Sequence, residues 1–364
     1  SQTTWTFSLA ILMLGLSAGF LGSFAEKIGP KKSGLLAMLF WVTGLLGTAY
    51  ALSIHNLTLL YLFYGIIGGI GLGIGYITPV STLVKYFPNR PGFATGLAIM
   101  GFGFASLIAG PLMQFLVAQF GLVNNFIILG VIYLVIMGAS SLYLKAPQQK
   151  HSTRTTKDKS TMYVHTHGML ANDAMKTWQF GALWWVFFIN ITCGIGLLSL
   201  ASPMAQEAIG MTPTAAASLV GIIGIFNGGG RIAWSTISDY LGRAKTYILF
   251  FIIEIVAFYL LAQTNSALTF QILILLIITC YGGGFSCMPA YLADLYGIRQ
   301  LSTIHGRILT AWGLAGITGP MLVSYFHEAG YGYTTALECF AALFVLNTII
   351  AIVLKIYGKR ELHN

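Results

Sequence analysis

The sequence predicts an all-α protein that crosses a membrane many times, and two observations support this prediction. Hydrophobic residues make up 56% of the chain and charged residues only 8%, whereas roughly a quarter of the residues in an ordinary soluble domain are charged. The 19 Lys and Arg residues fall, with two exceptions, on alternate loops between apolar segments. Basic loops mark the cytoplasmic face of a polytopic membrane protein, so the alternation also predicts the orientation.

The apolar segments are long enough to cross a bilayer, which takes about 20 residues each. We expect eleven spans, at residues 3–24, 33–54, 57–80, 92–118, 122–145, 180–203, 213–237, 245–263, 267–291, 302–326 and 332–356. The basic loops contain Lys27, Lys31 and Lys32; Lys85 and Arg90; Lys145 through Lys176; Arg243 and Lys245; Arg299; and Lys355, Lys359 and Arg360. We therefore expect the C-terminus and the central linker in the cytoplasm, and the protein in the inner (plasma) membrane of a bacterium.

Composition and spacing argue against several other classes of protein. The net charge of +9 is spread over loops, which suits an anionic lipid leaflet rather than nucleic acid. The cysteines lie in apolar runs without metal-ligand spacing, and His165-Thr166-His167 belongs to a polar stretch that we interpret as a solvated linker. We expect no metal and no cofactor. Paired carboxylates, metal ligands or a Ser/His/Asp set do not converge at one depth, so we expect a protein that is not an enzyme.

Comparing the chain with itself reveals an internal repeat. Three landmarks recur at shifts of 213, 210 and 209 residues: Glu26 and Gly29 with Asp239 and Gly242; Gly73 and Pro79 with Gly283 and Pro289; and Gly110-Pro111 with Gly319-Pro320. The repeat predicts two parallel halves, residues 1–145 and 180–364, joined by a cytoplasmic linker at 146–179. The partner of the span at 180–203 would precede residue 1. We therefore expect two six-helix halves with the first transmembrane helix missing from this chain; the alternative is a genuine eleven-span protein.

The two basic residues outside the loops, Arg231 and Arg307, lie inside apolar spans. Arg231 precedes Asp239 by eight residues, which is about 12 Å along a helix and near the middle of a ~30 Å hydrocarbon core. A charge there must face a polar cavity or a partner, and Asn227 lies one turn away on the same face. An arginine fork matches a carboxylate with two parallel hydrogen bonds. We expect Arg231 to bind a carboxylate substrate; the alternative is an ion pair with an intramembrane acid.

Arg307 lies only five residues inside its span, where a long side chain can reach the cytoplasmic face. Its role is therefore open between a substrate ligand and a gate or anchor residue. The intramembrane acids Glu254 and Glu338 are candidates for proton coupling, with a structural or interface role as the alternative.

The loop after the second helix of each half resembles a motif of the major facilitator superfamily. The first copy runs from Gly22 through Glu26-Lys27-Ile28-Gly29-Pro30-Lys31, with Glu for the usual Asp, and the second from Ser235 through Asp239-Tyr240-Leu241-Gly242-Arg243. The resemblance implies the major facilitator fold. It also implies that Glu26, Lys27, Gly29, Asp239, Gly242 and Arg243 act in gating and packing rather than in substrate choice.

A finer resemblance, to the oxalate/formate antiporter family, rests on several stretches. They are Phe188-Ile189-Asn190-Ile191-Thr192-Cys193-Gly194, Ala201-Ser202-Pro203-Met204-Ala205-Gln206, Tyr86-Phe87-Pro88 with Arg90-Pro91-Gly92, Asn227-Gly228-Gly229-Gly230-Arg231, and His305-Gly306-Arg307-Ile308-Leu309-Thr310-Ala311-Trp312. Members of that family carry small organic anions. The resemblance implies a secondary transporter that binds a small carboxylate, with protons or a counter-anion as the coupling partner.

Trp312 stands where oxalate-handling relatives are expected to place a second cation, a Lys. This difference favours a monocarboxylate such as lactate, pyruvate or formate, paired with Arg231 alone. Tyr76 and Tyr281 precede the matching Pro79 and Pro289 on helices that line the cavity in this superfamily, so they are further candidates for substrate contact, with ordinary packing as the alternative. An oxalate-type dicarboxylate exchanger and a metabolite sensor that binds without transport remain alternatives, and antiport and proton symport both stay open.

Overall fold

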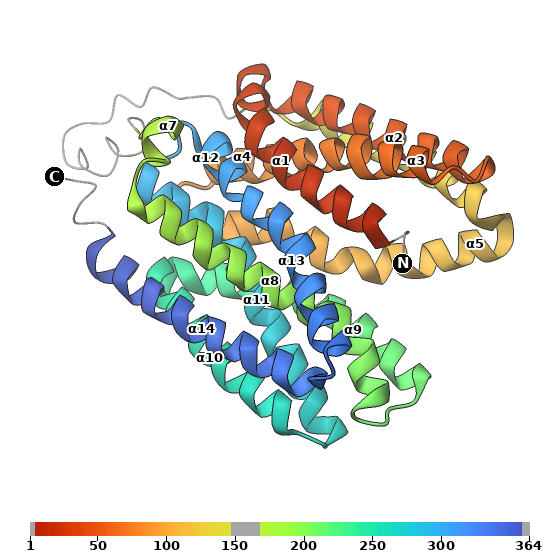
Figure 1. Ribbon diagram of the computed structural model, residues 1–364. Helices are drawn as coiled ribbons and strands as arrows, with labels where there is room; N and C mark the ends of the chain where they lie inside the picture. Colours follow the sequence, from red (N-terminus) through yellow and green to blue (C-terminus); the bar gives the residue numbers. More distant parts are fainter. Residues whose placement is uncertain (1–3, 147–167, 359–364) are drawn as a thin grey trace, which may run out of the picture. The chain divides into compact units, whose positions relative to one another are not determined.

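The computed structural model describes residues 4–146 and 168–358, and within these ranges the chain is helical and contains no strand. In chain order the elements are α1 (Thr4–Ile28), α2 (Pro30–Ser53), α3 (Leu57–Leu60), the π-helical η1 (Tyr61–Gly68), α4 (Gly69–Tyr86), α5 (Pro91–Tyr143), α7 (Ala171–Ala174), α8 (Trp178–Glu207), α9 (Pro213–Leu241), α10 (Arg243–Gln263), α11 (Ala267–Tyr296), α12 (Leu301–Ile308), α13 (Thr310–Glu328) and α14 (Gly332–Tyr357) (Figure 1). The expected all-α class is therefore confirmed. His151, His165 and His167 of the linker lie outside the described residues.

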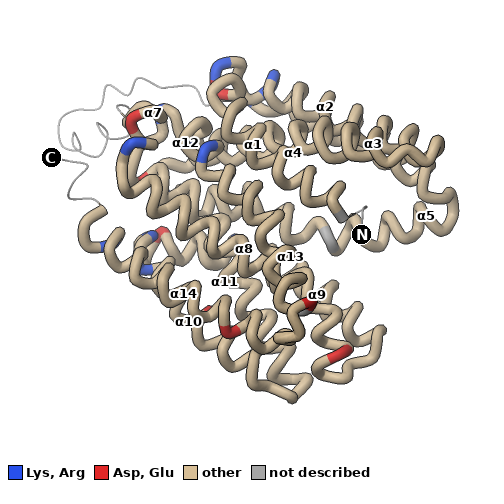
Figure 2. The backbone as a smooth tube through the Cα atoms, in the orientation of Figure 1, with Lys and Arg blue, Asp and Glu red and all other residues tan. Residues whose placement is uncertain are grey.

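Ten helices among the described residues are long and apolar enough to cross a membrane. The longest, α5, is interrupted at Gly121, where φ is 80° and ψ is 167°, so this helix consists of two segments. The expected break between residues 118 and 122 is therefore present. Most Lys and Arg residues lie at loops and helix ends, and long stretches of each helix carry no charge (Figure 2). The protein is an integral membrane protein by these criteria.

Several helices extend beyond the apolar segments from which they were predicted. The first predicted span ends at residue 24, but α1 continues to Ile28 and ends only where Gly29 adopts a φ of 82°. In the repeated loop, α9 ends at Leu241 and Gly242 adopts a φ of 89°. Residues with a Cβ rarely adopt such angles. The two glycines that the repeat paired therefore make the same backbone turn three residues after the paired acids.

The described chain groups into two compact units. Unit 1 comprises Ser1–Pro91, Pro111–Phe180 and Leu292–Gly313, and unit 2 comprises Gly92–Gly110, Gly181–Tyr291 and Leu314–Asn364. Each unit thus combines segments from both halves of the sequence, because helix segments of one half pack on segments of the other. The sequential halves inferred from the repeat, 1–145 and 180–364, remain a prediction.

In unit 1, α1 packs against α4 and α12, and α2 packs against α4. Glycines allow these helices to approach closely: a Cβ on Gly15 would lie 2.6 Å from the carbonyl oxygen of Leu309 and 2.7 Å from the amide nitrogen of Gly313. In unit 2, α10 packs against α14, with the ring of Phe258 against those of Phe340 and Phe344. Small residues at helix contacts are typical of membrane proteins.

Gly15→Ala should destabilise the protein because the new methyl group would meet backbone atoms that cannot move aside. We expect a loss of about 1–3 kcal/mol, the range for overpacked sites, seen as a lower Tm in detergent. Gly181→Ala, in α8, is the matched control, since nothing lies within 4 Å of its added Cβ. Equal melting temperatures for the two variants would contradict the close packing of α1.

Candidate functional site

Arg231 is buried in α9 with only 5% of its surface exposed. Its Nε donates a hydrogen bond to Oδ1 of Asn227 at 3.0 Å, one turn earlier, and its guanidinium carbon lies 4.9 Å from the ring centroid of Phe285. An aromatic face attracts a cation through the ring quadrupole. The side chain is therefore oriented by contacts that leave the guanidinium positively charged.

The glycine run of α11 makes room for this arrangement. A Cβ on Gly282 would lie 2.7 Å from the carbonyl oxygen of Asn227 and 3.2 Å from Cγ of Arg231. The hydroxyl of Ser286 donates to the carbonyl oxygen of Arg231 at 2.8 Å. These contacts hold α9 and α11 together at the level of the arginine, so the guanidinium stands on a rigid support.

Two further polar side chains belong to the same unit. Tyr281 is 5% exposed, lies within electrostatic range of Arg231, and packs its ring against Gly194 of α8. Asn190, also on α8, is fully buried, and neither amide atom has a hydrogen-bond partner among the described residues. Unit 2 thus brings Arg231, Asn227 and Tyr281 together, and their role in substrate binding stays a prediction. Asn190 of α8 lies against Gly284 of α11 in the same unit.

In unit 1, Tyr76 of α4 lies between two rings. Its centroid is 5.5 Å from that of Trp312 on α13 and 5.7 Å from that of His305 on α12. All three side chains are buried. Tyr76 and Trp312 were expected as substrate contacts, and unit 1 places them against each other. His305 belongs to one of the stretches that resemble the oxalate/formate antiporter family, but no feature of its local sequence predicted a buried ring contact.

Arg307 binds the short segment that follows the linker. One guanidinium nitrogen donates to Oδ1 of Asn172 at 2.7 Å and another approaches Sδ of Met175 at 2.9 Å. The backbone N–H of Ala171 in the same segment donates to Oε1 of Gln300 at 2.7 Å. Of the two roles left open for Arg307, these contacts favour the anchor over the ligand.

The acid of the second loop motif, Asp239, caps the N-terminus of α5. The carboxylate of Asp239 accepts hydrogen bonds from the backbone N–H groups of Gly92 and Phe93, both at 2.9 Å, at the start of α5. It also pairs with Arg243 at 2.5 Å, and the side chains of this pair are only 7% and 6% exposed. A carboxylate at a helix N-terminus satisfies otherwise unpaired N–H groups and the positive end of the helix dipole.

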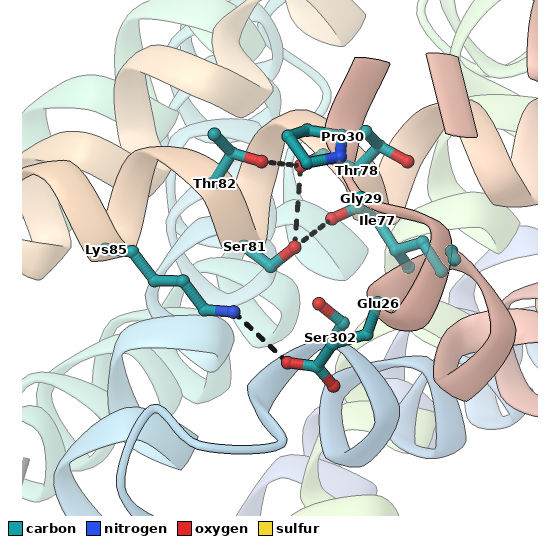
Figure 3. Close-up of a pocket in the computed structure, with 10 residues that line it drawn as sticks. Glu26, Gly29, Pro30, Ile77, Thr78, Ser81, Thr82, Lys85 and Ser302 are labelled. Carbon is teal, nitrogen blue, oxygen red and sulfur yellow. Dashed lines mark hydrogen bonds and ion pairs between the residues drawn. The ribbon is translucent and has the colours of Figure 1, made fainter. Parts of the chain in front are cut away.

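The first loop motif makes a looser contact. Oε1 of Glu26 pairs with Nζ of Lys85 at 3.1 Å, with side-chain exposures of 19% and 29%, and Oε2 accepts from the hydroxyl of Thr303 at 3.3 Å. This pair borders a cavity of about 40 Å³, to which Ser302 also contributes (Figure 3). The two copies of the motif therefore share a backbone turn but differ in how deeply their acids are buried.

The two intramembrane acids, Glu254 and Glu338, differ in their exposure and in their hydrogen bonds. Glu254 of α10 is 1% exposed, and its Oε2 has no hydrogen-bond partner among the described residues. Glu338 of α14 accepts a hydrogen bond from Nε2 of Gln263 at 3.1 Å in an exposed position. Of these two acids, Glu254 is therefore the buried one, and its part in proton coupling stays a prediction. A search of the described residues found no group of His, Cys, Asp and Glu that could hold a metal ion.

An all-helical chain with ten helices long and apolar enough to cross a membrane, among the described residues, belongs to the class of polytopic membrane proteins. The family model of the Major Facilitator Superfamily matches residues 1–243 and 183–362. The chain therefore belongs to the Major Facilitator Superfamily, as the loop motifs indicated. Its relatives are transporters rather than enzymes.

Curated relatives cover most of the chain at low identity. The MFS-type transporter YhjX of Escherichia coli strain K12 is 29% identical over 322 residues, 87% of this chain and 77% of that protein. The oxalate:formate antiporter of Oxalobacter formigenes is 26% identical over 339 residues, 92% and 77% of the two chains. Monocarboxylate transporter 12 of Rattus norvegicus is 24% identical over 377 residues, 94% and 76% of the two chains.

Solved structures confirm the fold. The human organic anion transporter MFSD10 superposes with a TM-score of 0.74 at 14% identity, over 96% of this chain and 82% of that one. The Escherichia coli fucose:proton symporter superposes with a TM-score of 0.70 at 15% identity, over 97% of each chain. At such identities the likeness concerns the fold alone.

Asp239→Asn should destabilise the protein more than Glu26→Gln, because it weakens a nearly fully buried ion pair. We expect losses of about 2 kcal/mol or more for Asp239→Asn and within about 1 kcal/mol for Glu26→Gln, measured as Tm shifts in detergent. Equal shifts would show that the difference in burial between the two loops has no energetic consequence.

Proposed function

We propose that this protein is a secondary active transporter that carries a small monocarboxylate by alternating access, with Arg231 pairing the carboxylate. The observation behind the proposal is a guanidinium buried in a membrane-spanning helix, oriented by Asn227 and by the ring of Phe285. A fork of N–H donors in this position matches the two oxygens of a carboxylate. The oxalate:formate antiporter and monocarboxylate transporter 12 among its relatives support the same substrate class.

In this mechanism the bound anion neutralises Arg231. Pairing two opposite charges in a low-dielectric interior is favourable when their hydrogen bonds are also made, so occupancy lowers the free energy of closed, water-free states. Asn227 and Tyr281 then orient the anion beside Arg231 within unit 2. Tyr76 and Trp312 remain separate candidates for substrate contact within unit 1. The loop motifs at Glu26, Lys27 and Gly29 and at Asp239, Gly242 and Arg243 act as gate elements that form and break with each cycle. In this proposal the protein lies in the inner membrane of a bacterium. Its central linker and its C-terminus face the cytoplasm.

Two other functions compete with this one. The match to the oxalate:formate antiporter favours a dicarboxylate exchanger, but a dianion requires a second cation, and Trp312 occupies the position from which we expect that cation to come. A metabolite sensor would bind the same anion without moving it. Uptake of oxalate but not of monocarboxylates would favour the first rival, and binding without flux in liposomes would favour the second.

Arg231→Lys should abolish most carboxylate uptake although the protein still folds, because an ammonium cannot make the paired hydrogen bonds of the guanidinium. Each lost charge-assisted hydrogen bond is worth about 1.5–3 kcal/mol, so we expect uptake of labelled lactate, pyruvate or formate into proteoliposomes to fall by at least tenfold. Arg299→Lys, an exposed loop residue, is the matched control. Full uptake in Arg231→Lys, with the control also active, would remove Arg231 from the site.

Proton coupling through Glu254 is the second part of the proposal. If its buried carboxyl carries the coupled proton, Glu254→Gln should remove the stimulation of uptake by an acid-outside pH gradient while leaving exchange between equal anion pools. Glu338→Gln is the control, because its carboxyl is exposed and bound to Gln263. Unchanged gradient-driven uptake in Glu254→Gln would assign the coupling elsewhere or favour anion antiport.

A further inference from the structure

A short segment immediately before α8 lies against the ends of α11 and α12, and we call these residues, 168–177, the strap. The N–H of Met169 donates to the carbonyl oxygen of Tyr296 at 2.9 Å, and a Cβ on Gly168 would lie 2.7 Å from the same oxygen. At the other end of the strap, the hydroxyls of Thr177 and Tyr296 are hydrogen-bonded at 2.8 Å. Both ends of the strap are therefore attached to the last residues of α11.

The middle of the strap contacts α12. The N–H of Ala171 donates to Oε1 of Gln300, the residue that precedes the first turn of α12, at 2.7 Å. Oδ1 of Asn172 accepts a hydrogen bond from Arg307 at 2.7 Å, and a charged donor makes such a bond stronger than a neutral one. Ala171 and Ala174 are 2% and 0% exposed, so the strap is also closely packed. The two polar contacts lie about two turns apart and together hold α12 along its length.

A different face of α12 packs against α1. A Cβ on Gly22 of α1 would lie 3.0 Å from the carbonyl oxygen of Ser302, and Oε2 of Glu26 accepts from the hydroxyl of Thr303 at 3.3 Å. Ser302 lies about 140° around the helix from Arg307, because each residue turns an α-helix by about 100°. Within unit 1, α12 is therefore held by α1 on one face and by the strap on another.

The strap and α1 differ in their relation to α12. The internal repeat predicts that α1 belongs to one half of the protein and α12 to the other, and alternating access separates such halves at one end in each cycle. The strap leads directly into α8, so it belongs with the half that contains α12 and can fix the position at which α12 meets α1. Because Asn172 is exposed, water can replace its bond to Arg307, and the strap can then release α12.

We propose that the strap is a releasable brace that holds α12 against α1 and so keeps this end of the transporter closed. The proposal rests on the proposed function, because it assumes alternating access. It makes Arg307 a positioning residue of the gate rather than a substrate ligand. It also makes the strength of the strap contacts a determinant of how often this end of the protein opens.

Labelling of a cysteine between α1 and α12 measures how often their contact opens. Ser302→Cys places a thiol at a position that is 5% exposed, beside the carboxylate of Glu26 in the small cavity (Figure 3). The rate at which N-ethylmaleimide labels this thiol in the purified full chain follows the population of the opened form. The same chain without Ser302→Cys gives the background from the native cysteines.

Loss of a strap contact should speed this labelling. We expect Asn172→Ala to raise the rate by about three- to tenfold, the range for the loss of one hydrogen bond. Gln300→Ala, which removes the acceptor for the N–H of Ala171, should raise it as well. Asn172→Ala should add nothing when Arg307→Ala is already present, because residues that act through one shared bond are not additive. Lys176→Ala is the matched control, since its ion pair with Asp173 lies within the strap.

Three results would overturn the inference. Labelling of Asn172→Ala and Gln300→Ala at the wild-type rate would mean that the contact of α12 with α1 does not depend on the strap. Equal increases in these variants and in Lys176→Ala, with a lower Tm, would mean a general loosening. Loss of carboxylate binding in Arg307→Ala without faster labelling would make Arg307 a substrate ligand. The labelling needs no substrate, so its outcome is distinct from that of the uptake assays, which test the proposed function.

Discussion

The positive charge of Arg231 inside a membrane-spanning helix is the constraint on which the arrangement of unit 2 depends. Inserting such a charge costs at least roughly 2.5–3.5 kcal/mol, so its neighbours must compensate. Asn227 accepts from its Nε, and Phe285 presents an aromatic face. Gly282 leaves the room that the side chain needs, since a Cβ there would touch both Asn227 and Arg231. The guanidinium of Arg231 is already oriented before an anion binds. Binding therefore does not have to supply the free energy of orienting it.

The two copies of the loop motif have the same backbone turn but make contacts that differ in burial. Gly29 and Gly242 both adopt positive φ angles at this turn. Asp239 is buried against the start of α5, whereas Glu26 makes a partly buried pair with Lys85 beside a small cavity. In the alternating-access cycle that we propose, contacts of both strengths have a use. A tight contact holds one arrangement firmly, and a weak one lets the helices separate at low cost.

Much of the fold could be predicted from the sequence, because apolar length and charge alternation are local properties. The spans and the break near Gly121 follow from such signals. So does the correspondence of Gly29 and Gly242 in the internal repeat. Asn227 and Arg231 were also predictable neighbours, since residues four apart share a helix face. Three contacts were not predictable: that of Phe285 with Arg231, that of the buried His305 ring with Tyr76, and the capping of α5 by Asp239. They depend on which helices pack together, and no local pattern encodes that packing.

The central claim is that Arg231 binds a carboxylate. The most direct measurement is thermal stabilisation of the purified protein by a panel of formate, acetate, lactate, pyruvate, oxalate and succinate, in the wild type and in Arg231→Ala. The account predicts that at least one monocarboxylate raises the Tm of the wild type, and that this shift disappears in the variant. Stabilisation that persists in Arg231→Ala, or that only the dicarboxylates produce, would contradict it.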